Sequence, residues 1–70
     1  MNRILIKSSN LHSVAYLREE QILEVEFQNS GVYQFYKVPV RMFFELLEAE
    51  SHGSYFNHHI KDHFRYRKIC

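Results

Sequence analysis

The sequence predicts a single α+β domain, in which a small antiparallel β-meander of three strands, or four, precedes an αα-hairpin packed on one sheet face. Two patterns favour this class. Apolar residues alternate with polar ones in the first half of the chain and recur at helical spacing in the second half. Seventy residues suffice for one domain, and six Phe and five Tyr supply the large side chains that so short a chain needs for its core.

The predicted strands occupy the first half of the chain. Residues 13–17 form one strand, and residues 4–7 are either a short edge strand or a loose arm. Residues 22–28 alternate apolar and polar side chains, which is typical of a strand with one buried face. Residues 32–38 are rich in aromatic and β-branched side chains and form the partner strand.

The loop between the last two strands decides which side chains face the core. Residues 29–31 suit a three-residue hairpin loop with Gly31 in the left-handed conformation, and this loop pairs Phe27 with Tyr33. A two-residue loop would turn every side chain to the other face. The inner face then receives Leu23, Val25, Phe27, Tyr33 and Phe35, and the outer face receives Glu24, Glu26, Val32, Gln34 and Tyr36.

The first predicted helix covers residues 40–50. Pro39 suits its first turn, because the missing N–H needs no partner there. Apolar residues, including Phe44 and Leu47, cover most of the circumference, so we expect core on nearly all sides of this helix. The narrow polar stripe consists of Arg41, Glu45 and Glu48.

The second predicted helix covers about residues 55–64. Gly53 ends the preceding helix and Ser54 caps this one. We expect an ordered core over about residues 6–66 and a frayed tail over residues 67–70. The buried stripe of the second helix consists of Phe56, Ile60 and Phe64.

Charge is divided unevenly along the chain. Residues 1–50 carry five Lys or Arg and seven Asp or Glu, a net charge of −2. Residues 51–70 carry four Lys or Arg and one Asp, a net charge of +3, together with four of the five histidines. This division indicates a charged partner, or else a solvated helix face.

Residue usage disfavours several classes of protein. The single Cys70 cannot form an internal disulfide, and no apolar run is long enough for a membrane span or signal peptide. We therefore expect a cytoplasmic protein without a membrane partner. His59 and His63 lie one turn apart, but without a fixed third ligand they do not indicate a metal site. Since no side chain is placed as an oriented nucleophile, we expect no enzyme activity and no cofactor.

An ordered set of residues resembles a known family. The set runs Ser8-Ser9, Tyr16, Leu23–Phe27, Gly31, Tyr33-Gln34-Phe35, Val38-Pro39, Leu46, Ala49, Ser51, Gly53, Tyr55-Phe56-Asn57 and Ile60. In this order the chain resembles the KTSC domain, which is named for its place at the C-terminus of some lysyl-tRNA synthetases. The resemblance spans about residues 6–66.

The resemblance implies a small bacterial domain, stand-alone or appended, whose activity is not established. RNA binding has been suggested for the family through its association with the synthetase. The central Tyr-x-Tyr of the family is Tyr33-Gln34-Phe35 in this sequence, so the second ring lacks its hydroxyl.

RNA binding, to tRNA or single-stranded RNA, is the leading functional hypothesis. Aromatic side chains stack on unpaired bases beside cations that hold phosphates. Because the hairpin aims Tyr33 and Phe35 at the core, and because acidic residues on the other face repel phosphates, we assign binding to the second helix and the tail. The predicted RNA-binding residues are His58, Lys61, Arg65, Tyr66, Arg67 and Lys68.

The alternative hypothesis is a module for protein interaction or dimerisation. Its contact surface would be the outer sheet face, where apolar side chains stand among charged ones. The predicted contact residues are Val32, Gln34 and Tyr36.

Overall fold

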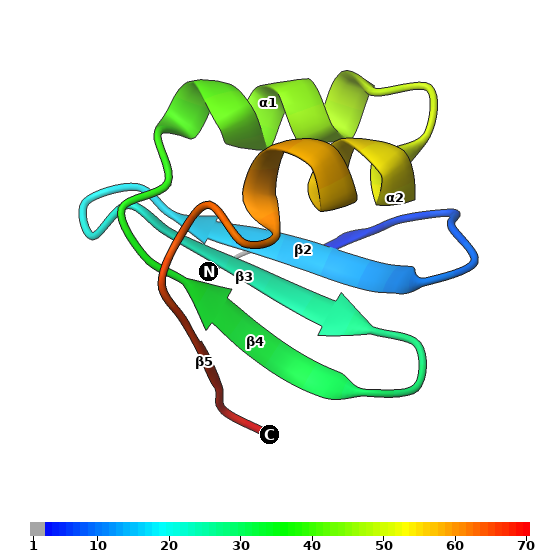
Figure 1. Ribbon diagram of the computed structural model, residues 1–70, viewed down its shortest axis with the longest axis horizontal. Helices are drawn as coiled ribbons and strands as arrows, with labels where there is room; N and C mark the ends of the chain where they lie inside the picture. Colours follow the sequence, from blue (N-terminus) through cyan, green and yellow to red (C-terminus); the bar gives the residue numbers. More distant parts are fainter. Residues whose placement is uncertain (1–2) are drawn as a thin grey trace.

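The computed structural model describes residues 3–70 and has two layers, with the helices above one face of a sheet (Figure 1). Five antiparallel strands follow one another across the sheet in sequence order. The elements are β1 Ile4–Leu5, β2 Leu11–Leu17, β3 Ile22–Phe27, β4 Gly31–Phe35, α1 Val40–Glu48, α2 His52–Tyr55, the π-helix η1 Phe56–Ile60 and β5 Tyr66–Lys68. The α+β class is therefore confirmed, but the predicted count of three to four strands was too low.

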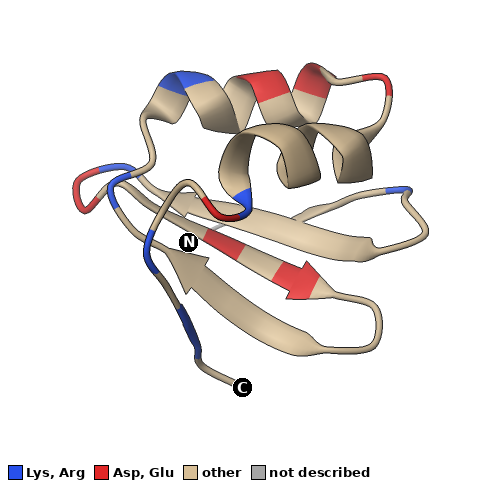
Figure 2. Ribbon diagram, viewed as in Figure 1, with Lys and Arg blue, Asp and Glu red and all other residues tan. Residues whose placement is uncertain are grey.

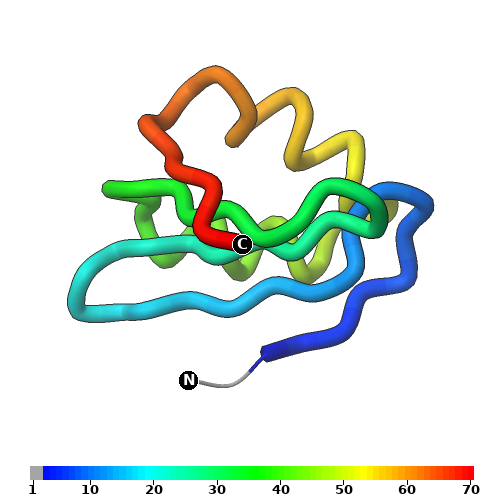
Figure 3. The backbone as a smooth tube through the Cα atoms, turned by 90° about the horizontal axis from the view of Figure 1, so that it is seen from below, coloured from blue at the N-terminus to red at the C-terminus, as the bar shows by residue number. Residues whose placement is uncertain are grey.

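The additional strand comes from the basic C-terminal segment. β5 pairs with β4, placing Tyr66 opposite Phe35, and the Ile69 N–H donates to the Val32 carbonyl at 2.8 Å. In Figure 3 the red C-terminal segment ends against the green β4. The sequence prediction gave this segment no strand, because residues 67–70 were expected to be a frayed tail. The free edge of β4 supplies the hydrogen-bonding partners that make it a strand.

The β3–β4 hairpin has the predicted faces but a different register. Phe27 lies opposite Gly31 rather than Tyr33, so the loop consists of residues 28–30 instead of 29–31. Gly31 has a φ of +93°, the left-handed conformation that the sequence predicts for it. Each residue of β3 pairs two positions earlier in β4 than predicted, and a shift of two leaves every side chain on its predicted face.

The core lies between the inner sheet face and the helices. The rings of Phe35 and Phe56 meet edge to face with centroids 5.2 Å apart, which joins β4 to η1. The hydroxyl of Tyr16 donates to the Val38 carbonyl at 2.5 Å, which fastens β2 to the segment that leads into α1. The most deeply buried apolar side chains are Leu11, Val14, Leu23, Val25, Val38, Leu46 and Ile60.

Helix α1 is less buried than predicted. Of its residues only Leu46 is fully buried, and Phe44 keeps 51% of its surface exposed. The helix rests on the sheet with one side (Figure 1), so apolar residues on its far side reach solvent. Arg41 and Glu45 of the predicted polar stripe lie one turn apart on the exposed side and form an ion pair, with 3.7 Å between Nε and Oε2. The prediction of a helix surrounded by core was wrong.

The second helical segment begins earlier than predicted. The side chain of Ser51 accepts a hydrogen bond from the Ser54 N–H at 3.2 Å, so Ser51 is the N-cap of α2. Gly53, predicted to end the first helix, lies inside α2 instead. The segment therefore starts three residues before the predicted position at 55.

The same segment also ends earlier than predicted. From Phe56 the helix widens into η1, and the Lys61 N–H donates to the Phe56 carbonyl at 2.8 Å across five residues. Regular hydrogen bonding stops after Ile60, and Asp62 takes a φ of +69°. Phe56 and Ile60 are buried as predicted, whereas Phe64 lies beyond the helix and is half-buried.

Candidate nucleic-acid interface

A groove of about 490 Å³ opens between the inner sheet face and the α2–η1 segment. The two short helical elements leave the inner face open at β4 and β5, where Tyr66 keeps 58% of its surface exposed. The apolar wall of the groove consists of Leu11, Phe27, Tyr33, Phe35, Phe56 and Tyr66. Its polar rim includes Asn10, Gln28, Asn57, Lys61 and Asp62. The groove thus joins aromatic rings to amide and charged groups.

The aromatic rings of the groove contact one another in a row. The Tyr33 ring lies 5.3 Å from Phe27, edge to face, and 5.9 Å from Tyr66. The Phe35 ring lies 5.5 Å from Tyr66 and is buried. The prediction that Phe35 belongs to the core is confirmed. Tyr33 also points inward, but it is only half-buried, and one side of it borders the groove.

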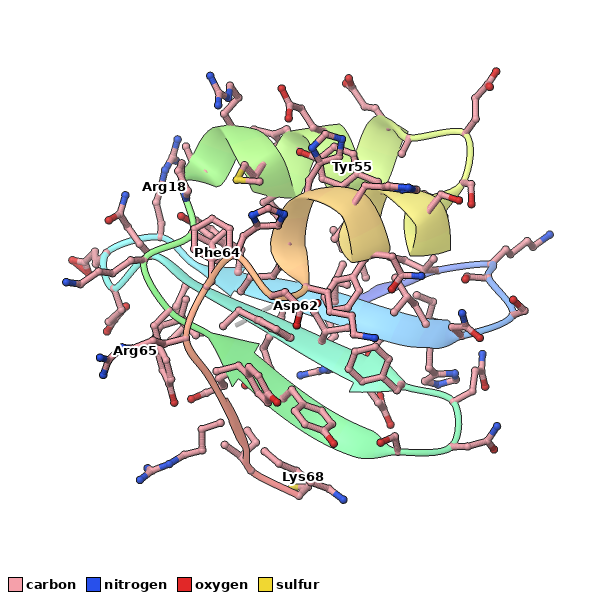
Figure 4. The ribbon with its side chains drawn as sticks, viewed as in Figure 1. Arg18, Tyr55, Asp62, Phe64, Arg65 and Lys68 are labelled. Atoms are coloured by element: carbon pink, nitrogen blue, oxygen red, sulfur yellow. The ribbon has the colours of Figure 1, made fainter. Side chains whose placement is uncertain are left out.

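Two lysines flank this row of rings. Lys61 lines the groove at the end of η1, and the Lys68 Nζ lies 5.9 Å from the centroid of the Tyr33 ring. Figure 2 shows Lys and Arg on the C-terminal segment and at the end of η1, and Asp and Glu on β3 and α1. Asp62 also lines the groove and lies between η1 and the sheet in Figure 4.

The structure distributes the predicted RNA-binding residues over several places. Lys61 and Tyr66 line the groove, and Lys68 lies beside Tyr33, one of the groove rings. Arg67 lies opposite Gln34 and therefore projects from the outer sheet face. Arg65 lies before β5, at the other end of the C-terminal segment from Lys68 (Figure 4). His58 is exposed on η1, where its Nδ1 lies 2.8 Å from the Ser54 carbonyl.

Sequence reasoning missed part of this groove. Phe27 was placed wholly in the core, and Asn10 and Asn57 were given no role in binding. The sequence did contain a signal for Asn57, because its polar amide directly follows Phe56, a residue of the predicted buried stripe. No local pattern placed Asn10 beside it, since the two residues meet only through the tertiary fold.

A hydrogen bond joins α2, which borders the groove, to α1. The hydroxyl of Tyr55 on α2 donates to the Glu45 Oε1 on α1 at 2.5 Å. Burial of the phenol, followed by this hydrogen bond and the negative charge of Glu45, raises the pKa of Tyr55 to about 12. Tyr55 therefore stays protonated at neutral pH and remains a hydrogen-bond donor.

The outer sheet face carries a hydrogen-bonded polar network. Gln34 donates to the Glu24 Oε1 at 3.0 Å and accepts a hydrogen bond from the Tyr36 hydroxyl at 3.4 Å. Arg3 pairs with the other Glu24 oxygen and donates to the Ser13 hydroxyl. The alternative contact residues Val32, Gln34 and Tyr36 lie on this face, as predicted, and are half-buried.

Glu24 is a buried but paired carboxylate. Burial raises its pKa, but the hydrogen bonds from Gln34 and Arg3 and the positive charge of Arg3 together outweigh burial and lower the pKa. Glu24 is thus ionised at neutral pH, and its negative charge is balanced inside the network. The expected repulsion between this face and phosphates is correspondingly reduced at Glu24.

The histidines make separate local contacts. The Tyr55 and His59 rings lie 4.5 Å apart, and the His63 Nε2 lies 3.1 Å from the His58 carbonyl. Within residues 3–70, no group of three or more His, Cys, Asp or Glu side chains is placed to hold a metal ion. Over the same described range, no helix has the length and apolarity required to cross a membrane.

Fold and groove together define a small α+β domain with an aromatic cleft between its sheet and its second helical segment. The KTSC domain model matches residues 7–64, and the chain belongs to the KTSC domain family. The family predicted from the ordered set of residues is therefore confirmed.

Relatives occur both as single domains and as parts of longer proteins. An uncharacterized protein of Stutzerimonas stutzeri (strain A1501) is 44% identical over 70 residues, which cover 99% of each chain. A lysine–tRNA ligase of Trichormus variabilis is 35% identical over 63 residues, which cover 90% of this chain and 11% of the ligase. The crystal structure of a KTSC domain protein from Yersinia pestis matches with a TM-score of 0.96 at 35% identity, covering 99% and 97% of the two chains.

Proposed function

We propose that this domain binds single-stranded RNA, with bases on the aromatic groove and phosphates at Lys61 and Lys68. The observation that carries the proposal is the exposed Tyr66 ring, which lies beside Tyr33 on the open part of the inner face. Stacking of a base on such a ring contributes about 1–3 kcal/mol, and it tolerates any base. The presence of the domain in lysine–tRNA ligases supports RNA as the ligand.

The proposed activity is binding without catalysis, in keeping with the cytoplasmic location expected from the sequence. Rings and amides make up most of the groove lining, and Lys61 and Asp62 are its charged residues within the described part of the chain. Such a lining suits a base, which presents a flat ring and hydrogen-bonding edges. The proposal keeps Lys61, Tyr66 and Lys68 from the predicted set and moves the bases into the groove.

The proposal can be tested by fluorescence anisotropy with a labelled, unstructured RNA oligonucleotide. We expect Tyr66→Ala to weaken binding about 5- to 150-fold, the equivalent of one lost stacking contact of about 1–3 kcal/mol. Lys61→Ala combined with Lys68→Ala should reduce the slope of log affinity against log salt by roughly 1.4, since each phosphate contact on a single strand contributes about 0.7.

The matched control is Arg18→Ala combined with Arg41→Ala, which removes two positive charges away from the groove. We expect this control to retain most of the affinity and the salt slope. Absence of binding at low salt would refute the proposed function. Equal losses in the two double variants would show that only net charge matters and would refute the assignment to the groove.

The second candidate function is self-association through the outer sheet face. No helix covers this face in Figure 1, and Leu5, opposite Ser13, is 76% exposed there. We expect Val32→Glu or Tyr36→Glu to dissociate such a dimer, and the lysine variants to leave it unchanged. Analytical ultracentrifugation measures this directly, and a monomeric wild-type chain at high concentration would exclude it.

A further inference from the structure

A second hollow, of about 320 Å³, adjoins the aromatic groove at its β2 end. Four residues line both spaces and therefore form the boundary between them: Ser9, Asn10, Gly53 and Asn57. The second hollow is further lined by Lys7, Ser8, Glu50, Ser51, His52 and Ser54. Its lining is thus rich in hydroxyl and amide groups, whereas the lining of the groove is rich in aromatic rings.

Gly53 lies on the boundary between the groove and the hollow and has no side chain that would separate the two spaces. A Cβ built on Gly53 would lie 3.6 Å from the Ser8 Oγ and 3.8 Å from the Asn10 Nδ2, so it would fill the space between α2 and the loop before β2. Glycine is not required here by the backbone, since Gly53 lies in α2 without a positive φ. Its missing side chain has the effect of leaving the two spaces in contact.

Several polar groups of the hollow are free to bind a ligand. Within residues 3–70, the side chains of Ser9, Asn10, Ser54 and Asn57 make no hydrogen bond to the protein, in contrast to Ser8 and Ser51, which accept from backbone N–H groups. Lys7 and Glu50 contribute opposite charges. A hollow with balanced charge and free hydroxyl and amide groups suits a neutral polyol better than a phosphate.

We propose, on the basis of the proposed function, that the hollow holds the ribose of a nucleotide whose base stacks in the adjoining aromatic groove. A sugar attached to a base bound beside Asn57 would pass over Gly53 and reach Ser9 and Ser54. The 2′-hydroxyl is the group by which proteins distinguish RNA from DNA, and it both donates and accepts hydrogen bonds. The domain therefore prefers RNA to DNA of the same sequence.

The test compares three oligonucleotides of one sequence, as RNA, 2′-O-methyl RNA and DNA, by fluorescence anisotropy at fixed salt. We expect the RNA to bind about tenfold more tightly than the other two, which corresponds to one lost hydrogen bond to a polar group. Ser9→Ala combined with Ser54→Ala should remove this preference by weakening RNA binding alone. Gly53→Leu should do the same by filling the boundary, while circular dichroism confirms that the helix remains.

The control is Tyr36→Phe, which removes a hydroxyl from the outer sheet face, away from the groove and the hollow, and should leave the preference for RNA unchanged. Equal affinity for RNA and DNA, with both lost in Tyr66→Ala, would refute the ribose site and leave the groove as a stacking platform. A preference for RNA that survives both hollow variants would also refute the ribose site. No binding of any of the three oligonucleotides would refute the proposed function itself.

Discussion

Phe44 and Leu46 lie two positions apart on α1 and have opposite environments. Leu46 is fully buried against the sheet, whereas Phe44 is half exposed. We expect Leu46→Ala to lower the free energy of unfolding by about 2–5 kcal/mol, because it leaves a cavity in a small core. Phe44→Ala should cost less than about 1 kcal/mol, as is usual away from the core. Urea denaturation measures both values, and similar costs would show that α1 is rotated from its position here.

Glu24 links folding to pH through its lowered pKa. As the pH falls below the ordinary glutamate pKa of 4.5, the unfolded chain takes up its proton before the folded chain does, so stability decreases. The contribution is complete above 4.5 and is lost as the pH falls through the folded value. We expect Glu24→Gln to flatten the dependence of unfolding free energy on pH in this acidic range. An unchanged acid slope in the variant would show that Glu24 is not the responsible group.

The two glycines, Gly31 in β4 and Gly53 in α2, differ in whether the backbone requires glycine at their position. Gly31 begins β4 with a positive φ, and a Cβ there would collide with the Cys70 carbonyl oxygen, so Gly31→Ala should destabilise the domain by more than about 1 kcal/mol. Gly53 lies in α2, where a Cβ meets only ordinary contacts, and Gly53→Ala should stabilise by up to about 1 kcal/mol. Thermal unfolding of the two variants checks the opposite signs, and a shift in the same direction would contradict the assigned conformations.

The sequence patterns predicted the strands of the hairpin better than the helices. Alternation fixed the faces of Val25 and Phe35, because burial on one side of a sheet tolerates no shift by one residue. Helical periodicity gave the wrong surroundings for Phe44, since it counts apolar residues but does not show how many sides of a helix have a partner. The limits of α2 were missed because Ser51 and Ser54 are equally suitable caps, and only the tertiary fold selects Ser51.

The candidate site was predicted in part. The charge division drew attention to Lys61, Tyr66 and Lys68, which lie at or beside the groove, but it also included Arg67, which the strand turns to the opposite face. Tail residues have no local pattern that reveals pairing with a strand thirty residues earlier. The groove itself arises from where α2 and η1 stop covering the sheet, and a single sequence carries no signal for that.

The fifth strand, β5, contributes Tyr66 to the groove lining, and its three residues are exposed instead of part of the core. Among residues 3–70, no fully buried apolar side chain follows Ile60, so deletion of residues 66–70 should leave a cooperatively folded domain of lower stability. The same deletion removes Tyr66 and Lys68 and should abolish RNA binding. Circular dichroism and anisotropy on the truncated chain test both halves of this prediction. Retained affinity would place the binding surface elsewhere on the molecule.

The widened turn of η1 has a consequence for how this chain tolerates insertions and deletions. Five residues rather than four separate the hydrogen-bonded Phe56 carbonyl and Lys61 amide, so the turn holds one residue more than a regular α-helical turn. Removing one residue between them would restore regular helical geometry. The lysine that now pairs across five residues would then pair with the same Phe56 carbonyl across four, so it would stay close to its present position. A homologue shorter by one residue here is therefore expected to have a regular helical turn and to keep a cation at this place.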